Sequence, residues 1–341
     1  MKLLYLSCHS ILEFDELRIF SKLGIDVFSF GTYHNPKKID DPKRPTLDLP
    51  YHPDLEALCA KTTQEDIPQE VIDWADVIVC MHKPDWLVKN WEKFKGKRVI
   101  ERTIGQNMID NENILLALRQ RGLEVVRYSP QEKTIPGYAG HDAIIRFAKD
   151  PKEFGCWEGT REIVLNITQD MFARGGACNA TFYDMATKGF PRLLIGKGSE
   201  VLGGEGAGIV SYDEMKKALR ECSVYFYTGT YPASYTLNFM EALMTGCPIV
   251  ALGPKFGNNP RYPEFSLYEI SEFAKQSMGI FLADDVATAR KHIQSILENE
   301  TLAEEMSSEN RKLAIELFGI EKITKQWKEF LLGHISAKVA Q

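Results

Sequence analysis

Short apolar runs alternate with longer mixed segments along most of the chain, and this alternation predicts parallel βαβ units. In the first half, the apolar runs predict buried strands at residues 3–7, 26–30, 76–81, 98–102 and 124–128. Helices are expected between them, the first over residues 11–23. Strands separated by helices of this length indicate a parallel sheet that is covered on both faces.

A stretch rich in glycine and proline, residues 130–160, interrupts this rhythm. We expect one short helix in it, over residues 141–147, and interpret the stretch as a connection between two domains. The rhythm then resumes, with strands predicted at 163–167, 192–195, 224–227 and 248–252 and helices at 176–187 and 212–221. A proline-rich loop over residues 32–53 and a second loop over residues 254–263 complete the outline, and further helices are expected from there up to residue 331.

Length and composition fit a globular protein of two α/β domains. The chain has 341 residues and a net charge of −6, which disfavours a generally basic nucleic-acid binder or a polybasic membrane anchor. Its seven cysteines are scattered and form no C-x-x-C pair, which favours reduced thiols in a cytoplasmic protein. The first apolar run is too short for a signal peptide, and no run approaches the length of a transmembrane span.

Ligands of parallel α/β sheets bind at the carboxyl ends of the strands, so the residues after each strand are site candidates. His9 follows the first strand, where an acceptor or diphosphate contact and a structural role are both open. His82 follows the third strand and is expected to face a cleft, while Asp85 is expected to cap the next helix. For Arg102, a strand-end salt bridge and an anion contact are equally compatible with the sequence.

Two loops of the second half have the composition of anion and nucleotide sites. Gln169, Arg174 and Gly175 lie between a strand and a predicted helix, where a guanidinium group and first-turn amides can share a diphosphate. Gly196 and Lys197 follow the next strand, where glycine permits close approach of a flat base. A second glycine cluster, residues 203–208, is at least as compatible with a flexible surface loop.

The segment 231–253 combines a polar loop, a short apolar helix and a strand. Ser234 lies in the loop, and the helix that follows offers the backbone amides of Tyr235, Thr236 and Leu237 to an anion. Glu241 lies within the helix among apolar neighbours, and a buried acid needs partners. We therefore expect Glu241 to bind a ligand instead of lying on a solvated helix face.

This segment resembles the nucleotide-binding domain of retaining GT-B glycosyltransferases. Their signature is Glu, seven residues, and a second Glu followed by A-[ML]-x-x-G-x-P-[IV]-[VI], and residues 241–250 read EALMTGCPIV. The run IGKG at 195–198 and the stretch 207–215 are also similar to the family, and residues 318–327 resemble its closing helix. The resemblance spans about residues 163–332. The first half matches only in architecture and in the segment HKPDW.

The resemblance implies two Rossmann-like domains that face each other across a cleft. Residues 1–150 would bind the acceptor, residues 160–317 would bind the nucleotide sugar, and residues 318–341 would pack back toward the first domain. The implied activity is transfer of a hexose or pentose from a nucleotide-diphosphate sugar.

 The transfer is expected to proceed with retention and without a metal ion or cofactor, and the nucleotide-diphosphate sugar serves as co-substrate. The acceptor is a glycan, a lipid-linked group, a small molecule or, less in keeping with the charge, a nucleic acid.

The resemblance also implies a role for each candidate residue. Glu241 would hold the donor ribose and is counted with His9 and His82 among the catalytic candidates, the histidines positioning the acceptor or stabilising charge. The diphosphate set is Arg174, Gln169, Gly175 and the amides of Tyr235, Thr236 and Leu237. The base set is Gly196, Lys197, Gly208, Ile209 and Val210.

Three departures from the family pattern leave other functions open. Ala233 stands where the first Glu is expected, Gln169 stands where an Arg is usual, and the N-terminal glycine-rich turn is absent. Sugar contacts would then come from Ser234 or Tyr235. The alternatives are a degenerate GT-B protein that binds a nucleotide or partner without catalysis, and a GT-B epimerase or phosphorylase. The basic stretch 89–102 suggests a phosphorylated or nucleic-acid acceptor, although a solvated helix face is the preferred interpretation.

Overall fold

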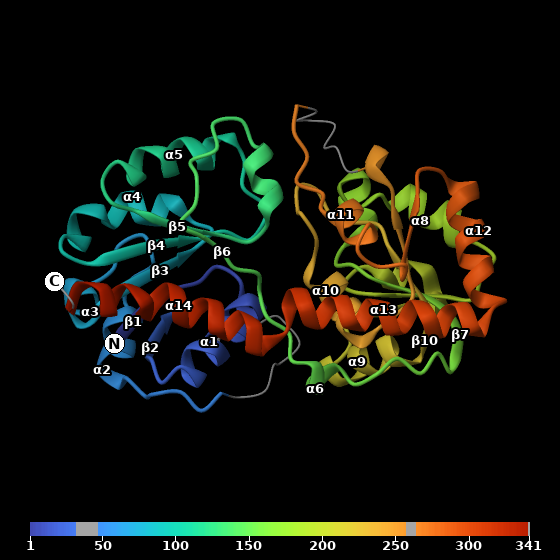
Figure 1. The fold of residues 1–341 in the computed structure, drawn as a ribbon, viewed down its shortest axis with the longest axis horizontal. Helices are drawn as coiled ribbons and strands as arrows, with labels where there is room; N and C mark the ends of the chain where they lie inside the picture. Colours follow the sequence, from blue (N-terminus) through green and yellow to red (C-terminus); the bar gives the residue numbers. More distant parts are fainter. Residues whose placement is uncertain (32–46, 257–263, 340–341) are drawn as a thin grey trace. The chain divides into compact units, whose positions relative to one another are not determined.

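The computed structural model describes residues 1–31, 47–256 and 264–339, with side chains described as far as residue 333. The chain divides into two compact units. Unit 1 comprises Met1–Ala148 and Glu321–Gln341, and unit 2 comprises Lys149–Ile320. Each unit is built on a sheet of six strands with helices on its faces (Figure 1).

The sheet of unit 1 has the strand order β2-β1-β3-β4-β5-β6, and every neighbouring pair is parallel. Its strands are β1 (Lys2–Leu6), β2 (Asp26–Phe30), β3 (Val77–Met81), β4 (Arg98–Arg102), β5 (Glu124–Arg127) and β6 (Ala143–Ile144). All five residues of β3 are buried, which is the burial expected for a central strand of a covered parallel sheet.

Short helices connect these strands, and the last helix of the chain returns to unit 1. The helices are α1 (Ser10–Lys22), α2 (Pro53–Cys59), α3 (Gln69–Trp74), α4 (Pro84–Asn90), α5 (Ile109–Arg119) and α14 (Ile320–Val339). Trp327 of α14 is fully buried, and its ring packs edge-on against the Phe20 ring of α1, with the two ring centroids 5.3 Å apart. Arg98 donates hydrogen bonds to the carbonyl oxygens of Phe330 and Leu331. The prediction that the closing helix packs on the first domain is confirmed.

The sheet of unit 2 has the order β12-β11-β10-β7-β8-β9 and is also parallel throughout. Its strands are β7 (Arg161–Ile167), β8 (Arg192–Ile195), β9 (Gly206–Gly208), β10 (Cys222–Tyr227), β11 (Ile249–Leu252) and β12 (Ile280–Ala283). The α-helices are α6 (Pro151–Phe154), α7 (Met171–Arg174), α8 (Ala180–Thr187), α9 (Tyr212–Glu221), α10 (Leu237–Thr245), α11 (Ile270–Ala274), α12 (Val286–Leu297) and α13 (Glu300–Phe318). The predicted α/β class with two parallel sheets is confirmed.

Several local expectations are wrong. Residues 141–147 form no helix; they contain β6, which pairs with β5. The helix predicted over 176–187 begins only at Ala180, because Gly175 and Asn179 have φ angles of 51° and 53° that interrupt it. Strands β9 and β12 and helix α2 were not expected. The parts of the predicted loops at residues 32–46 and 257–263 lie outside the described residues.

Candidate functional site

The strand orders locate one topological switch point in each sheet. In unit 1 the chain leaves β1 for β2 on one side and returns to β3 on the other. In unit 2 the equivalent neighbours are β7 and β10. Ligands of such sheets bind beyond the carboxyl ends of the strands at this point. The candidate residues are therefore those that follow β1 and β3 in unit 1 and those that follow β7, β8 and β10 in unit 2.

The loops after β7 and β8 are held together by backbone and side-chain hydrogen bonds. The amide of Asp170 donates to the Lys197 carbonyl at 2.7 Å, and the Lys197 amide donates to Oε1 of Gln169 at 2.7 Å. Gly196 has a φ of 138°, and a Cβ atom there would lie 2.3 Å from the Thr168 carbonyl oxygen. Glycine is thus required at this position by both conformation and close contact. The structure thus brings Gln169 of the predicted diphosphate set together with Gly196 and Lys197 of the predicted base set, and the roles of these residues stay predictions.

Arg174 projects from the same edge, but not in the expected setting. It is the last residue of the short helix α7, and Gly175 continues into a 3-10 turn, Gly175–Cys178. Arg174 and Gly175 therefore do not precede the first turn of a long helix, and the expected set of first-turn amides is corrected. The Arg174 side chain is exposed, and its Nη1 lies 3.5 Å from the Gln169 carbonyl oxygen. Its guanidinium group is available to an anion at this edge.

The start of α10 differs from the expected anion site. Thr236 caps the helix by accepting from the Phe239 amide at 3.4 Å. The Thr236 amide already donates to the Tyr227 hydroxyl at 3.1 Å, so it is not open to a diphosphate. Ser234 and Tyr235 are 0% and 2% exposed, and their contact with a sugar stays a prediction. Roles for the Tyr235 and Leu237 amides stay predictions.

Sequence reasoning missed Asn238, which joins α10 to the switch point. Its Nδ2 donates to the carbonyl oxygen of Ile167, the last residue of β7, at 3.0 Å. Its position as a polar residue in the first turn of a mostly apolar helix was the available signal. This bond fixes the start of α10 against the loop that carries Gln169.

Glu241 is buried in α10 and faces a cation. Its Oε1 lies 3.0 Å from Nζ of Lys149, and the two side chains are 1% and 2% exposed. The expectation that a buried Glu241 has a partner is confirmed, but the partner in this structure is a lysine that the sequence analysis did not single out. The catalytic and ribose-binding roles of Glu241 stay predictions.

The other expected base-binding residues lie at the end of β9 and directly after it. Gly208 has a φ of 66°, and its amide donates to Oγ of Ser199 at 2.8 Å. The next residue, Ile209, is 55% exposed, and Val210 is partly buried. An exposed isoleucine beside a rigid glycine turn offers an apolar surface on which a flat base can stack. The assignment of the base to Gly208, Ile209 and Val210 remains a prediction.

In unit 1, His9 and His82 follow the two strands of the switch point. His9 is the N-cap of α1, and its Nδ1 accepts from the Leu12 amide at 3.4 Å, so the structural alternative for His9 has direct support. His82 has a φ of 54°, a left-handed conformation that is uncommon outside glycine and enriched at functional sites. Its Nδ1 lies 3.1 Å from Oδ1 of Asn107, and burial lowers the pKa of its imidazole to about 4. Asp85 does not cap α4, because the N-cap is Lys83.

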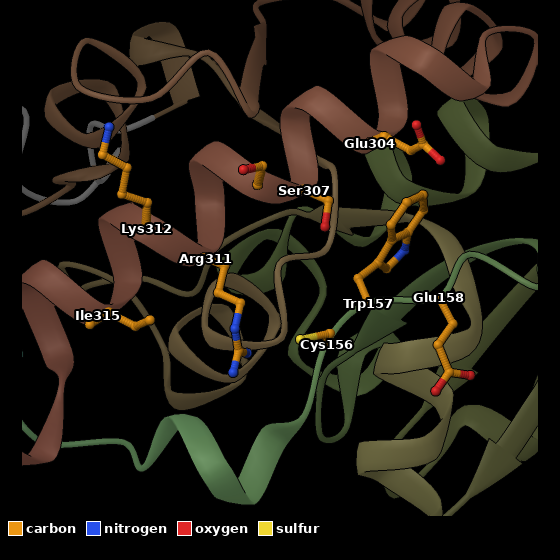
Figure 2. A pocket seen from close by; sticks show the side chains of 9 residues that line it. Cys156, Trp157, Glu158, Glu304, Ser307, Arg311, Lys312 and Ile315 are labelled. Atoms are coloured by element: carbon orange, nitrogen blue, oxygen red, sulfur yellow. The ribbon is translucent and has the colours of Figure 1, made fainter.

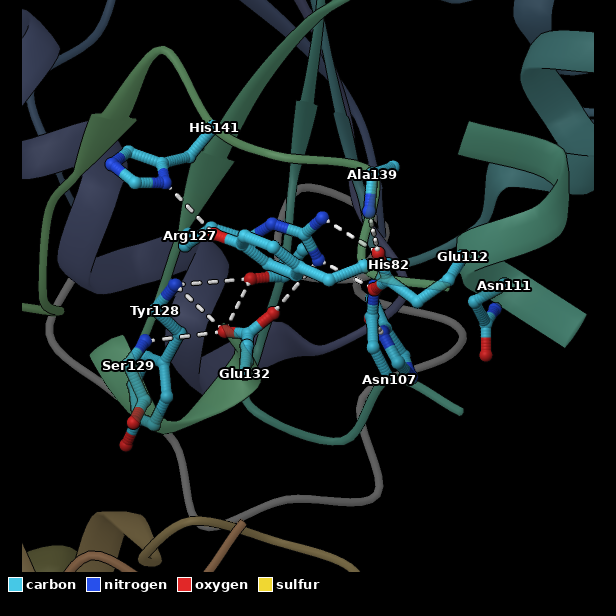
Figure 3. Close-up of polar contacts among 12 residues, drawn as sticks. His82, Asn107, Asn111, Glu112, Arg127, Tyr128, Ser129, Glu132, Ala139 and His141 are labelled. Carbon is cyan, nitrogen blue, oxygen red and sulfur yellow. Dashed lines mark hydrogen bonds and ion pairs between the residues drawn. The ribbon is translucent and has the colours of Figure 1, made fainter. Parts of the chain in front are cut away.

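Buried ion pairs lie behind this edge (Figure 3). Arg127 donates to both oxygens of Glu112, at 2.6 and 2.7 Å, and to Glu132 at 3.2 Å. Arg102 is fully buried and pairs with Glu16 at 2.7 Å, which selects the salt bridge over the anion contact. These pairs fix the residues that surround His82.

The basic stretch 89–102 is neutralised locally. Lys89 and Lys93 pair with Glu65 and Asp66, each at 2.5 Å, and Arg98 pairs with Glu124 at 2.7 Å. Lys97 donates to the carbonyl oxygens of Asp73 and Ala75. These contacts do not present an open row of cations to a phosphorylated or nucleic-acid acceptor.

A cavity of about 570 Å³ lies elsewhere in unit 2, between α13 and residues 156–158 (Figure 2). Arg311 lines it, but its guanidinium donates to the carbonyl oxygens of Pro151, Gly155 and Met244. Trp157 Nε1 donates to the Cys222 carbonyl oxygen. Both of these side chains are engaged with backbone carbonyl groups, and none of the predicted donor residues lines the cavity.

No helix in the described part of the chain has the length and apolar composition of a membrane span. Within residues 1–31, 47–256 and 264–339, no group of three or more His, Cys, Asp or Glu side chains is arranged to hold a metal ion. Comparison of the sequence with models of protein families gives no match, and comparison with curated proteins gives none either.

The fold, in contrast, is shared with solved structures over the full chain. Sucrose-phosphate synthase from Thermosynechococcus elongatus is similar with a TM-score of 0.72 and 15% identity, over 99% of this chain and 100% of that one. Anabaena HepE in complex with UDP and glucose is similar with a TM-score of 0.66 and 14% identity, over 97% and 99%. A glycosyltransferase from Rickettsia africae is similar with a TM-score of 0.67 and 10% identity, over 97% of this chain and 98% of that one. The chain therefore has the two-domain α/β fold of GT-B glycosyltransferases.

Proposed function

We propose that this protein transfers a sugar from a nucleotide-diphosphate donor to an acceptor hydroxyl group. The observation that carries the proposal is the full-length similarity to glycosyltransferase structures, one of which was crystallised with UDP and glucose. Two exposed cations, Arg174 and Lys197, at the switch-point edge of unit 2 support it. Unit 2 is assigned to the donor and unit 1 to the acceptor.

In this proposal the side chains of unit 2 neutralise the departing nucleoside diphosphate. Arg174 and Lys197 supply positive charge, and the rigid contacts between Gln169 and Lys197 hold the loops in place before the donor binds. Fixed donors and charges aimed at a developing anion lower the barrier to its departure. The same proposal has two further parts: the transfer retains the anomeric configuration of the sugar, and it needs no metal ion. Full turnover after treatment with a chelator supports the second part, and loss of turnover that Mg²⁺ or Mn²⁺ restores contradicts it.

Binding of nucleoside diphosphates tests the donor site directly. Calorimetry with UDP, GDP, ADP and TDP is expected to give saturable binding of at least one of them. Arg174→Ala should weaken that binding about tenfold or more, which corresponds to about 1.4 kcal/mol. The matched control is Arg161→Ala, because Arg161 is an exposed arginine at the opposite end of β7. Binding that is equally weakened in both variants, or absent for all four nucleotides, contradicts the donor site.

Transfer itself is tested by product analysis. The protein is incubated with nucleotide sugars that carry the base selected by calorimetry, together with glycan, lipid-linked and small-molecule acceptors. A glycosylated product is expected from one combination. Isomerised donor in place of a glycosylated product would identify an epimerase instead.

A second candidate function is nucleotide binding without catalysis. It is favoured by Ala233, which is 5% exposed and stands where an acid is expected, and by the engagement of Glu241 with Lys149. Tight nucleotide binding without transfer or donor hydrolysis, with every acceptor class, identifies this function.

A further inference from the structure

The carboxylate of Glu112 is held so that it acts only as a hydrogen-bond acceptor (Figure 3). It is fully buried and receives both Nη atoms of Arg127, at 2.6 and 2.7 Å. Its Oε2 also accepts from the Ala139 amide at 2.8 Å. Two guanidinium N–H groups and one backbone N–H therefore converge on its two oxygens.

This carboxylate sets the orientation of the Asn107 amide. Asn107 is 1% exposed, and its Nδ2 donates to Oε1 of Glu112 at 3.0 Å. The opposite orientation would set the amide oxygen against a carboxylate oxygen, so that two acceptors would face each other. The Asn107 oxygen must therefore point away from Glu112. It lies 3.1 Å from Nδ1 of His82.

The orientation of Asn107 in turn determines where His82 carries its proton. An amide oxygen only accepts, so Nδ1 of His82 must be the donor. Burial lowers the pKa of the ring to about 4, so the imidazole is neutral at physiological pH and Nε2 keeps its lone pair. The amide of His82 also donates to the Arg102 carbonyl at 3.0 Å, which holds the residue in its left-handed conformation.

We propose that Glu112 and Asn107 are positioning residues that hold His82 as the Nδ1–H tautomer, so that Nε2 accepts a hydrogen bond from a sugar hydroxyl group. The identity of the ligand rests on the proposed function, whereas the tautomer does not. A neutral acceptor at this edge selects a hydroxyl group and gives no attraction to a phosphate.

Nitrogen NMR of the full chain, labelled with ¹⁵N-histidine, measures the tautomer in the absence of any ligand. The seven histidines give separate ring signals, and the loss of one in His82→Asn assigns that residue. The expected result is a protonated Nδ1 and an unprotonated Nε2. A protonated Nε2 with a bare Nδ1, or a doubly protonated ring at neutral pH, overturns the proposal.

The variant Asn107→Leu tests the origin of the tautomer. It removes the amide oxygen, and the ring of His82 is expected to shift toward the Nε2–H form. His52 is an internal reference, because its Nε2 lies 2.8 Å from an Asp26 oxygen and should stay protonated in every variant. Asn111→Leu is the matched control, since Asn111 bonds the Met108 amide and does not contact His82. An unchanged His82 tautomer in Asn107→Leu overturns the proposal, and if that variant does not fold, the wild-type spectrum decides alone.

Turnover distinguishes the source of the hydroxyl group once a donor is known. If it belongs to the acceptor, Asn107→Leu raises the acceptor KM and leaves hydrolysis of the donor unchanged. If it belongs to the transferred sugar, both transfer and hydrolysis fall. Unchanged transfer with a shifted tautomer overturns the hydroxyl contact. Failure of nucleotides to bind, with the tautomer as expected, overturns the proposed function and leaves the tautomer assignment intact.

Discussion

Lys149 and Glu241 form an ion pair that is almost completely shielded from solvent, with Nζ 3.0 Å from Oε1. Lys149 is the first residue of unit 2, and its amide donates to the carbonyl of Phe318 at the end of α13. The ion pair therefore ties the beginning of unit 2 to α10, and the amide hydrogen bond ties it to α13. Two charges in such a place are stable only while both are present.

The first prediction is that Lys149→Met destabilises the protein by about 3–5 kcal/mol, because it leaves the Glu241 carboxylate buried without its cation. The double variant Lys149→Met, Glu241→Leu should recover most of the loss. Urea unfolding measures both. Lys275→Met is the control, since Lys275 pairs with Glu272 at the surface and such a pair contributes about 0–1 kcal/mol. A loss in Lys149→Met as small as in the control contradicts the prediction.

A second prediction contrasts two buried acids of unit 1. Glu101 is fully buried, and within the described chain neither of its oxygens has a hydrogen-bond partner. Burial raises the pKa of this carboxyl well above its ordinary value of 4.5. The folded protein therefore keeps it protonated while the unfolded chain ionises, and stability falls as the pH rises above about 4.5. Glu101→Leu should stabilise the protein at neutral pH by about 1 kcal/mol or more.

Glu112→Leu should do the opposite and cost about 3–5 kcal/mol, because it breaks the buried bidentate pair with Arg127 and leaves Glu132, at 3.2 Å, as the carboxylate partner of that guanidinium. Thermal unfolding at acidic and neutral pH compares the two variants. The gain in Glu101→Leu should shrink as the solution is acidified. Equal destabilisation by both substitutions would show that Glu101 has a partner in solution.

The positions of the strands follow from the sequence because a strand buried on both faces is a block of apolar residues. Three predicted strands, at 26–30, 98–102 and 192–195, have the bounds of β2, β4 and β8. Strand β6 has only two residues, which is too short for such a pattern. The break before α8 depends on a left-handed Asn179, whose conformation is set by tertiary contacts, including its hydrogen bond to the Thr228 carbonyl.

The candidate site was predictable to the level of loops but not of side-chain partners. Parallel topology brings the ends of β7 and β8 to one edge, so both loops were predicted as ligand sites, but the hydrogen bond between Gln169 and Lys197 was not. The partner of Glu241 is 92 residues away in the sequence, and no local spacing relates the two. The same holds for His82 and Asn107, whose contact depends on a buried acid on a different element.

A third prediction concerns the pH dependence that His82 imposes on stability. Burial lowers its pKa from 6.5 to about 4, so the unfolded chain takes up a proton in this range and the folded protein does not. The contribution of the neutral His82 to stability is therefore fully present above about pH 6.5 and is lost as the pH drops toward 4. When the pH is lowered from about 7 to about 5, the free energy of unfolding of His82→Asn should fall by about 1–2 kcal/mol less than that of the wild type. Asparagine is chosen because it tolerates the left-handed backbone. Identical pH profiles of unfolding would contradict the assignment of a buried, neutral His82.

The last prediction compares two glycines at the edge of unit 2. In Gly196→Ala, the added Cβ would lie 2.3 Å from the Thr168 carbonyl oxygen, at a φ of 138° that alanine rarely adopts. The loops after β7 and β8 must then separate, which breaks the contact between Gln169 and Lys197. We expect a stability loss of about 1–3 kcal/mol and a loss of UDP affinity of about tenfold or more, or about 1.4 kcal/mol.

Gly176→Ala is the matched variant, because its Cβ would meet no atom within 4 Å. It should leave stability and UDP affinity within a few tenths of a kcal/mol of the wild type. Unfolding in urea and calorimetry with UDP measure both quantities on the same protein samples. Normal UDP affinity in a folded Gly196→Ala protein would show that the donor does not depend on the joined loops. Equal losses in the two variants would place the diphosphate nearer to Gly175 and Gly176 than to Gly196.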